Sequence, residues 1–293
     1  MNNLPIQKRV QIINLLVEGN SLRSTSRIAD VSINTVTKLL VDVGRACMNF
    51  HNTHVVGLKS TKIQADEIWS FVGCKDKNAT PEQKESGMGD AWTWVGIDAD
   101  SKLVVSWFVG NRSAESAIEF MNDMASRLTN RVQLTTDGLH SYLEAVTDSF
   151  GSQIDFAQLV KIYGSSSDSS NKTERKYSPA KLKSITKNVI SGNPDLEHVS
   201  TSYVERQNLT MRMHMRRFTR LTNAFSKKVE NHIHAIALHF VYYNFVKQHK
   251  SLRITSAMAA GITKRFMSIE DIANLVIIEA PKKRGLYKKI VAN

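Results

Sequence analysis

The hydrophobic repeat of this chain changes near residue 60, and the change divides the sequence into a helical part and a sheet-forming part. Before it, apolar residues recur with the spacing of amphipathic helices. After it, segment 62–72 alternates apolar and polar residues as a half-buried strand does. The sequence therefore predicts an all-α unit followed by an α/β domain. Its 293 residues, 42% of them hydrophobic, are enough to build both cores.

The first 48 residues have the helix order of a DNA-reading unit. Pro5 and Gly19 bracket a first helix. Ser21 and Ala29 bracket a short second helix, and Ser32 is placed to cap a third. This order is that of the helix-turn-helix, whose last helix enters the major groove, although a three-helix packing unit without DNA is the alternative. The side chains that we expect to contact base edges or the phosphate backbone are Arg23, Arg27, Asn34, Thr35 and Lys38.

Strands and helices alternate after residue 60, as they do in α/β domains. The expected strands are 62–72, 92–98, 103–109, 132–136 and 156–162. One helix is expected to begin at Ser113, and a second helical segment, after the fourth strand, is expected to end at Ala145. Two later helices are expected at 203–220 and 226–248, and segment 179–198 stays unassigned. The expected divisions are a helix-turn-helix domain at 1–48, a linker at 49–60, an α/β domain at 61–222 with a polar insert at 73–91 and a mobile loop at 164–176, and a helical basic region at 223–293.

Three acids stand where a ribonuclease-H-like domain would bring carboxylates together. Three strands, a helix and a fourth strand are the opening order of that fold. Asp66 lies in the middle of the first strand, Asp137 follows the fourth, and Glu205 lies near the start of a later helix. Such carboxylates repel one another unless divalent cations neutralise them, and oxygen ligands favour Mg²⁺ or Mn²⁺. Two ions about 4 Å apart would activate a water or 3′-hydroxyl and stabilise the leaving oxygen of a phosphodiester.

Each of these acids also has a structural alternative. Asp66 could be a charge on an edge strand, Asp137 an ordinary turn residue, and Glu205 an acid favoured at a helix start. Glu174 and Glu197 are the rivals of Glu205 for the third position. The acids that we expect to have no part in the site are Glu67, on the strand face opposite Asp66, and the turn residues Asp98 and Asp100.

The positive charge of the chain lies in its last third. Residues 1–202 carry 22 Lys and Arg against 22 Asp and Glu, whereas residues 203–293 carry 17 against 5. This imbalance indicates a polyanionic partner, with a solvated lysine-rich face as the alternative reading. The arginines that we expect to hold DNA are Arg212, Arg216, Arg217 and Arg220, and a basic tail follows at Lys282, Lys283, Arg284, Lys288 and Lys289.

Four motifs carry a family resemblance that covers about residues 1 to 280. They are Asp-Glu-Ile-Trp-Ser-Phe-Val at 66–72, Thr-Asp-Gly at 136–138, Tyr-Val-Glu-Arg-Gln-Asn at 203–208, and Tyr-Asn-Phe at 243–245 with Ser-Leu-Arg at 251–253. In this order they resemble the DDE transposases of the first-described bacterial insertion-sequence family, insertion sequence one. The resemblance implies that Asp66, Asp137 and Glu205 are the catalytic, metal-binding acids. It also implies that Arg212, seven residues after Glu205, contacts the DNA backbone.

The implied function is that of a transposase, a DDE polynucleotidyl transferase that cleaves and joins DNA strands with Mg²⁺. Its partners would be the terminal inverted repeats of its mobile element and target DNA. Because two element ends must meet, we expect a homodimer or a larger homo-oligomer. The alternatives are a non-catalytic DNA-binding regulator derived from such an enzyme, which needs none of the acids, and a ribonuclease-H-like nuclease that cuts without joining.

The location expected from the sequence is the cytoplasm, in association with the nucleoid. Cys47 and Cys74 have neither a zinc-site spacing nor a disulfide framework, which fits a reducing compartment. No signal peptide is evident at the N-terminus. The longest apolar run, 233–246, is interrupted by polar residues, so we expect a buried helix there and no contact with a membrane.

Overall fold

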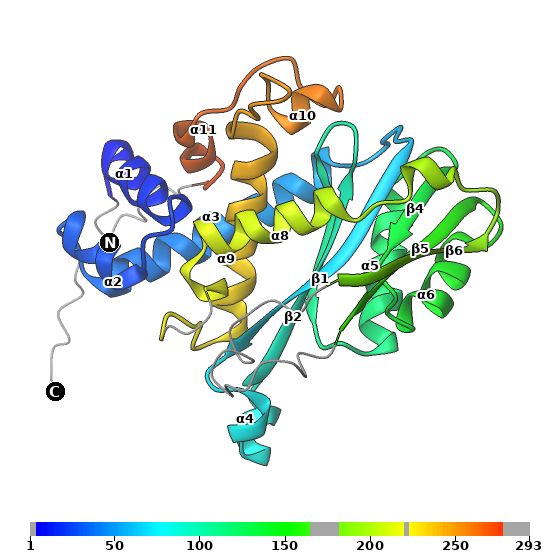
Figure 1. The fold of residues 1–293 in the computed structure, drawn as a ribbon. Helices are drawn as coiled ribbons and strands as arrows, with labels where there is room; N and C mark the ends of the chain where they lie inside the picture. The colour runs from blue at the N-terminus through cyan, green and yellow to red at the C-terminus, as the bar shows by residue number, and fades with distance from the viewer. Residues whose placement is uncertain (1–3, 165–181, 220–222, 278–293) are drawn as a thin grey trace, which may run out of the picture.

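A six-stranded mixed sheet in the order β3-β2-β1-β4-β5-β6 forms the centre of the α/β fold (Figure 1). The computed structural model describes residues 4–164, 182–219 and 223–277. β1 is parallel to β4, and β4 is parallel to β5, while the other neighbours are antiparallel. The strands are β1 (Lys62–Val72), β2 (Gly89–Asp98), β3 (Val104–Gly110), β4 (Val132–Thr136), β5 (Ile154–Tyr163) and β6 (Leu182–Ser191).

The N-terminal helices are α1 (Ile6–Val17), α2 (Leu22–Ile28) and α3 (Ile33–His54). Both serines predicted as caps have that role: Ser21 Oγ accepts the N–H of Ser24, and Ser32 Oγ accepts that of Thr35. α3 continues to His54, so the first half of the segment expected to be a linker is helical. Its buried residues keep the helix continuous because they pack on the body of the protein.

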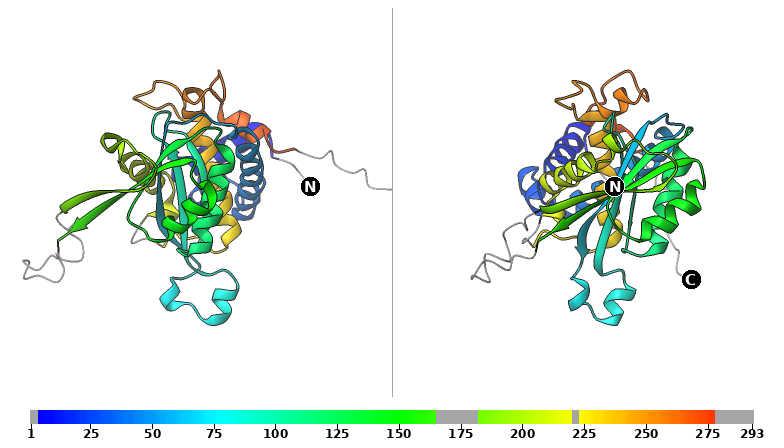
Figure 2. Two further views of the ribbon diagram at one scale, coloured as in Figure 1. Left: turned by 90° about the vertical axis from the view of Figure 1, so that its right-hand side faces the viewer. Right: turned by 45° about the vertical axis from the view of Figure 1, so that its right-hand side comes forward.

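Helices cover the two faces of the sheet (Figures 1 and 2). On one face, Trp94 of β2 packs against Phe120 and Tyr142 from α5 and α6. On the other face, Trp107 of β3 contacts His51 of α3 and Phe240 of α9. These helices are α5 (Ala114–Arg127), α6 (Ser141–Phe150), α8 (Ser202–His214) and α9 (Val229–Val241), which continues as the π-helical turn η4 (Tyr242–Val246).

Short elements complete the described chain. The polar insert between β1 and β2 forms a projection that Figure 2 shows at the bottom of both views. Two further short helices follow η4. The short elements are η1 (Asp76–Asn78), α4 (Pro81–Glu85), η2 (Leu196–His198), η3 (Arg216–Phe218), α10 (Ser256–Ala259) and α11 (Ile269–Asn274). No helix among the described residues is long and apolar enough to cross a membrane.

The strands expected at 62–72 and 132–136 are confirmed with the same bounds. β6 lies in the unassigned segment, and its residues 182–190 are all exposed, so no apolar alternation marks it. The helix expected at 203–220 is shorter, because Met215 takes an extended conformation and ends α8 at His214. The helix expected at 226–248 corresponds to the continuous helical stretch of α9 and η4. Residues 165–176 of the serine-rich loop, Arg220 and the basic tail lie outside the described residues.

One hydrophobic core runs through the molecule, from Ile12 in α1 to Ala273 in α11. Its tightest helix contact joins α3 to α9: a Cβ added at Gly44 would stand 2.4 Å from the Cβ of His234. Arg9 of α1 also donates a hydrogen bond to the carbonyl oxygen of Ala273. The N-terminal helices are therefore packed against the end of the described chain, with no gap in the core between them.

Candidate active site

Asp66 lies where one edge of β1 becomes free. β1 pairs with β2 from Ile63 to Phe71, but its parallel pairing with β4 stops at Ala65. From Asp66 to Phe71, that side of β1 has no neighbouring strand among the described residues, which leaves an opening at Asp66, and Val72 then forms a bridge with Ser226. The amide of Asn208 in α8 donates a 2.9 Å hydrogen bond to Asp66 Oδ2, which orients the carboxylate.

Asp137 enters the same opening from β4. It follows Thr136, the last residue of that strand, and its Oδ1 accepts the N–H of Leu139 at 2.9 Å. This hydrogen bond closes a turn, so Asp137 does act as a turn residue, which was the alternative to a functional role. Its second carboxylate oxygen still projects towards β1. The turn passes close to β5, since a Cβ added at Gly138 would stand 3.1 Å from a methyl group of Val160.

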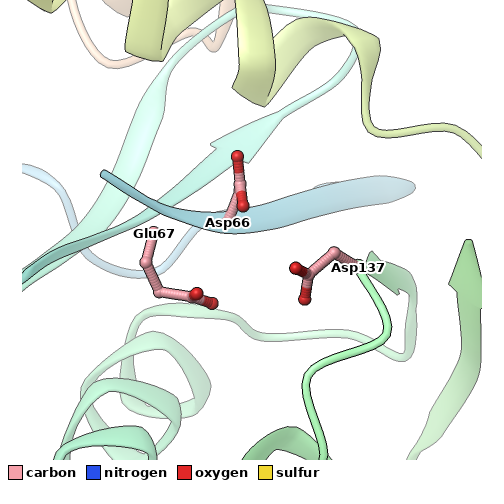
Figure 3. A group of neighbouring side chains, drawn as sticks. All are labelled: Asp66, Glu67 and Asp137. Carbon is pink, nitrogen blue, oxygen red and sulfur yellow. The ribbon is translucent and has the colours of Figure 1, made fainter. Parts of the chain in front are cut away.

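Glu67 also lies close to these two acids, which its strand position did not predict. One oxygen from each of Asp66, Glu67 and Asp137 lies within 4.8 Å of the others (Figure 3). Glu67 leaves the opposite face of β1, as expected from the pleat, but its longer side chain turns towards Asp137. The sequence signal that could have indicated this is the pair of adjacent acids. Where one edge of a strand is unpaired, side chains from its two faces can meet around that edge.

Glu205 is held at the same cavity by the start of α8. The side-chain oxygen of Gln64 in β1 accepts the N–H groups of Tyr203 at 2.8 Å and Val204 at 3.2 Å. These bonds satisfy donors that the first turn of any helix leaves unpaired, and they fix α8 over β1. Asp66, Asp137 and Glu205 consequently line one cavity of about 480 Å³.

The carboxylate of Glu205 is separate from the tight group of three. It accepts a 2.6 Å hydrogen bond from Thr201 and forms an ion pair with Lys161 of β5. Its side chain is 46% exposed, whereas that of Glu67 is 1% exposed. The structure thus brings the three sequence-predicted acids to one cavity, with Glu205 at its more open side.

Two basic side chains partly balance the acids. Arg112 Nε lies 3.2 Å from Glu67 Oε2, and its Nη2 lies 3.9 Å from Asp137 Oδ2. The guanidinium also lies over the ring of Trp92, 4.8 Å from its centroid. Lys161 pairs with Glu205, and Arg112 and Lys161 both line the cavity. Neither residue was predicted from the sequence, because each lies outside the motifs.

The buried acids hold protons more tightly than free carboxylates do. Burial raises the pKa of Asp66 to about 6, and the charge of Asp137 adds to the rise. Burial likewise raises the pKa of Glu67 to about 7; Asp137 adds to this rise and Arg112 opposes it. A bound cation would favour the charged forms of both groups and lower both values.

The donor atoms of this site suit a hard divalent cation. They are carboxylate oxygens, which Mg²⁺ and Mn²⁺ prefer. Asn208 Oδ1 is a buried acceptor without a hydrogen-bond partner among the described residues, so it has free lone pairs beside the acids. Glu67 shares a hydrogen bond with the buried hydroxyl of Tyr142. Asp66, Glu67 and Asp137 offer the closest ligand set, and Glu205 could complete it from the same cavity.

The other acids considered from the sequence lie elsewhere. Asp98 is a turn residue, as expected: its Oδ1 accepts the N–H groups of Asp100 and Ser101. Glu197 is exposed in η2 and does not line the cavity. Glu174 lies outside the described residues. Glu205 is therefore the better placed of the candidates for the third position that the structure describes.

The expected DNA contacts of the N-terminal unit are on its surface. Arg23, Arg27 and Asn34 are exposed, and exposed Lys38 forms a 3.6 Å ion pair with Asp42. Thr35 is half-buried, and its hydroxyl lies 2.9 Å from that of Ser32 at the helix cap. The hydroxyl of Thr35 therefore already has a structural partner.

The later arginines divide into different environments. Arg216 is exposed in η3, and Arg212 at the end of α8 is half-buried. Arg217 was expected to contact DNA but points inward, where it donates to Ser226 Oγ at 3.0 Å and to the carbonyl oxygen of Asn231 at 2.9 Å. Burial lowers the pKa of Arg217 to about 10. Arg217 thus braces the segment before α9, which makes it a poor phosphate contact.

No protein-family model matches this chain, and no curated protein is significantly similar to it.

Proposed function

We propose that this protein is a DDE transposase that binds the ends of a mobile element and catalyses cleavage and joining of DNA strands. The observation that carries the proposal is the meeting of Asp66, Asp137 and Glu205, from β1, the end of β4 and α8, at one cavity. The three residues are far apart in sequence and come from separate elements. Carboxylates collected in this way suit metal-dependent transfer of phosphodiesters.

The sheet supports a ribonuclease-H-like assignment for the catalytic part. Its first five strands have the order β3-β2-β1-β4-β5, with β1, β4 and β5 parallel to one another. Asp137 follows the carboxyl end of a parallel strand, where α/β sheets form their sites, and Asp66 stands beside that end on the neighbouring strand. In this assignment β6 is an additional antiparallel strand at the sheet edge.

The acids would bind the cations, and the neighbouring bases would position the DNA. Asp66 and Asp137 are the leading ligands, with Glu205 on the open side. Bound Mg²⁺ would activate the attacking oxygen and stabilise the leaving one. Arg112 and Lys161 stand where they can exchange their carboxylate partners for the oxygens of a phosphodiester, which draws the scissile bond towards the acids.

The N-terminal helices would read the element ends as a helix-turn-helix. α2 and α3 are joined by a four-residue turn with Asp30 at a φ of 50°. Asn34 and Lys38 on α3 are the leading candidates for contact with base edges, and Arg23 and Arg27 for contact with the backbone. Two ends must be held together for transposition, so we propose a homodimer or larger assembly on the DNA of the nucleoid.

Exposed Arg216 provides a quantitative prediction for backbone binding. Arg216→Ala should weaken DNA binding for all sequences alike and lower the slope of log affinity against log salt by about one unit. Titrations at several salt concentrations with specific and random duplexes measure both quantities. An unchanged slope would place Arg216 away from the phosphates.

The deciding experiment is strand transfer of a labelled element end into plasmid DNA with Mg²⁺. Wild type is compared with Asp66→Asn, Asp137→Asn and Glu205→Gln at matched DNA binding. Joining that each substitution abolishes, while binding survives, supports the proposed triad. Cutting without joining indicates a nuclease, and binding without either reaction indicates a regulator. If Glu205→Gln alone stays active, Glu67 is the next candidate, because its carboxylate lies beside those of Asp66 and Asp137.

A further inference from the structure

A second cavity, of about 1200 Å³, lies at the far end of α8 from the acids. It separates α2 and the start of α3 from residues 215–217 and 223–227 after α8, which Figure 1 shows in yellow beside the blue helices. The back of the cavity is a close contact: His214 Nδ1 lies 3.2 Å from the carbonyl oxygen of Val17. A Cβ added at Gly19 would stand 3.1 Å from the carbonyl oxygen of Met213. The N-terminal unit and the end of α8 thus form one wall.

The charge on this cavity has a single sign. Arg23 from α2, Arg216 and Arg217 from η3, and Lys227 before α9 all line it, whereas none of its described lining residues is an acid. Arg217 is engaged internally, but Arg23, Arg216 and Lys227 are exposed. Positively charged side chains that line a cleft raise the local concentration of anions. The cavity therefore suits an anionic occupant.

The remaining lining mixes apolar side chains with polar ones. Leu22, Ile33 and Phe225 contribute to it, and Ile33 is 40% exposed. His239 is 2% exposed, and neither of its ring nitrogens has a hydrogen-bond partner among the described residues. A free inorganic anion would gain nothing from such walls. Nucleic-acid strands differ, because their bases offer flat apolar faces and polar edges while their phosphates pair with cations.

We propose that this cavity, named the strand cavity, holds an unpaired strand of DNA next to the reading helix. The inference rests on the proposed function, since it assigns the path of the DNA within a transposase. At 1.5 Å rise per residue, Glu205 and His214 are about 14 Å apart along α8. The exposed side chains of Leu209 and Met213 lie between these two ends. A strand in the cavity would thus continue along α8 to the acids, with bases resting on these side chains.

Two neighbouring lysines give a matched test. Lys227 lines the strand cavity, while Lys228 is equally exposed but does not line it. Binding of a fluorescent single-stranded oligonucleotide is measured with the full-length chain in EDTA, which prevents cleavage. Lys227→Ala should weaken binding several-fold and lower the salt slope by about 0.7. Lys228→Ala should leave both quantities unchanged, and equal effects of the two substitutions would overturn the proposal.

A second variant tests whether the oligonucleotide needs the volume of the strand cavity, independently of its positive charge. Ala224 is half-buried at the cavity, so Ala224→Trp would occupy part of it without altering any charge. We expect lower affinity for the single strand and unchanged affinity for an element-end duplex, with an unchanged circular dichroism spectrum. Loss of duplex binding alone would show that the cavity takes paired DNA and would overturn the assignment.

The failure of this inference can be told apart from failure of the proposed function. If the lysine and tryptophan variants behave as expected but wild type joins no strands with Mg²⁺, the strand cavity stands and the transposase proposal falls. If strand transfer succeeds while the variants bind single strands as well as wild type does, the activity stands and the strand cavity is overturned.

Discussion

At the scale of single residues, the buried carboxyl of Asp66 has a cost for stability. Its folded pKa of about 6 is above the value near 4 of an unfolded aspartate, so the folded state binds this proton more tightly. Stability is therefore unaffected below pH 4, falls as the pH rises from 4 through 6, and is lower above that range. The full effect is about 3 kcal/mol at most, at about 1.4 kcal/mol per pKa unit.

Asp66→Asn should remove this penalty. In EDTA near pH 8 we expect the free energy of unfolding to rise by about 1–3 kcal/mol, and the gain should vanish near pH 4. Asn can still accept the hydrogen bond from Asn208. Urea unfolding between pH 4 and 8 measures the effect, with Asp148→Asn on the exposed side of α6 as a control. An Asp66→Asn variant less stable than wild type near pH 8 would contradict the expectation that burial and repulsion by Asp137 make the charged Asp66 carboxylate unfavourable.

A bound divalent cation should stabilise the folded protein, whereas the ionised carboxylate of Asp66 alone destabilises it. Mn²⁺ that binds only the folded state at a hundredfold excess over its Kd adds about 2.7 kcal/mol. Asp137→Asn should lose most of this gain, because it removes a charged ligand, while Asp148→Asn should keep it. Thermal unfolding with Mn²⁺ or EDTA makes the comparison. The same shift in all three proteins would indicate binding away from the acids.

The sequence predicts some residues of the site and misses others for a definite reason. Asp66 was recognisable because an acid interrupts an alternating strand, and Asp137 because it ends one. Glu67 does leave the strand face opposite Asp66, as expected, but alternation describes where a side chain starts and says nothing about where a long one ends. Arg112 and Lys161 come from other strands and loops, so only the folded arrangement brings them to the acids.

At the scale of elements, the first turn of α8 is tied to one side chain of β1. Gln64 is buried, and its oxygen accepts two N–H groups of the first turn of α8. Removing it would leave two backbone donors without their partner, and an unsatisfied buried donor costs about 1–3 kcal/mol. The same change would loosen the helix start that carries Glu205.

Gln64→Ala should therefore lower both stability and activity. We expect a loss of about 1–3 kcal/mol in urea unfolding and faster amide exchange at Tyr203 and Val204. Gln158→Ala is a suitable control, because this buried glutamine of β5 donates its hydrogen bond to the carbonyl oxygen of Leu139, outside α8. Unchanged exchange at the start of α8 would show that other contacts hold the helix.

Elements were predictable where apolar residues recur at regular spacing. β1 and β4 were found with correct bounds because apolar and polar residues largely alternate in their sequences. β6 was missed because its pairing to β5 uses the backbone, while both of its faces carry exposed side chains. The end of α8 was missed because no Gly or Pro marks it; the extended conformation of Met215 appears only with the packed neighbours.

At the scale of the whole molecule, the contact between α3 and α9 determines how the N-terminal unit is held. No side chain larger than hydrogen fits at Gly44 without moving His234. The two helices are far apart in the sequence. Helix periodicity could therefore show that each has an apolar face, but not that these two faces pack against each other. The hydrophobic core consequently continues through the divisions suggested by sequence at residues 48 and 60.

Gly44→Ala tests this contact. Although alanine favours a helix by about 1 kcal/mol over glycine, we expect net destabilisation by about 1–3 kcal/mol from overpacking. Asn49→Ala on the exposed side of α3 should be close to neutral. Urea unfolding followed by fluorescence gives both values. A Gly44→Ala protein as stable as wild type would mean that α3 and α9 separate easily.

The same contact has a consequence for synthesis on the ribosome. α3 ends at His54, but the helix that covers it begins only at Val229. At usual elongation rates of about 5–20 residues per second, roughly 10–35 s pass between the two. During that interval the nascent α3 lacks its partner surface, so a newly made chain should acquire its final form only near release. An interrupted translation product would then expose the apolar side of α3, a target for chaperones and proteases.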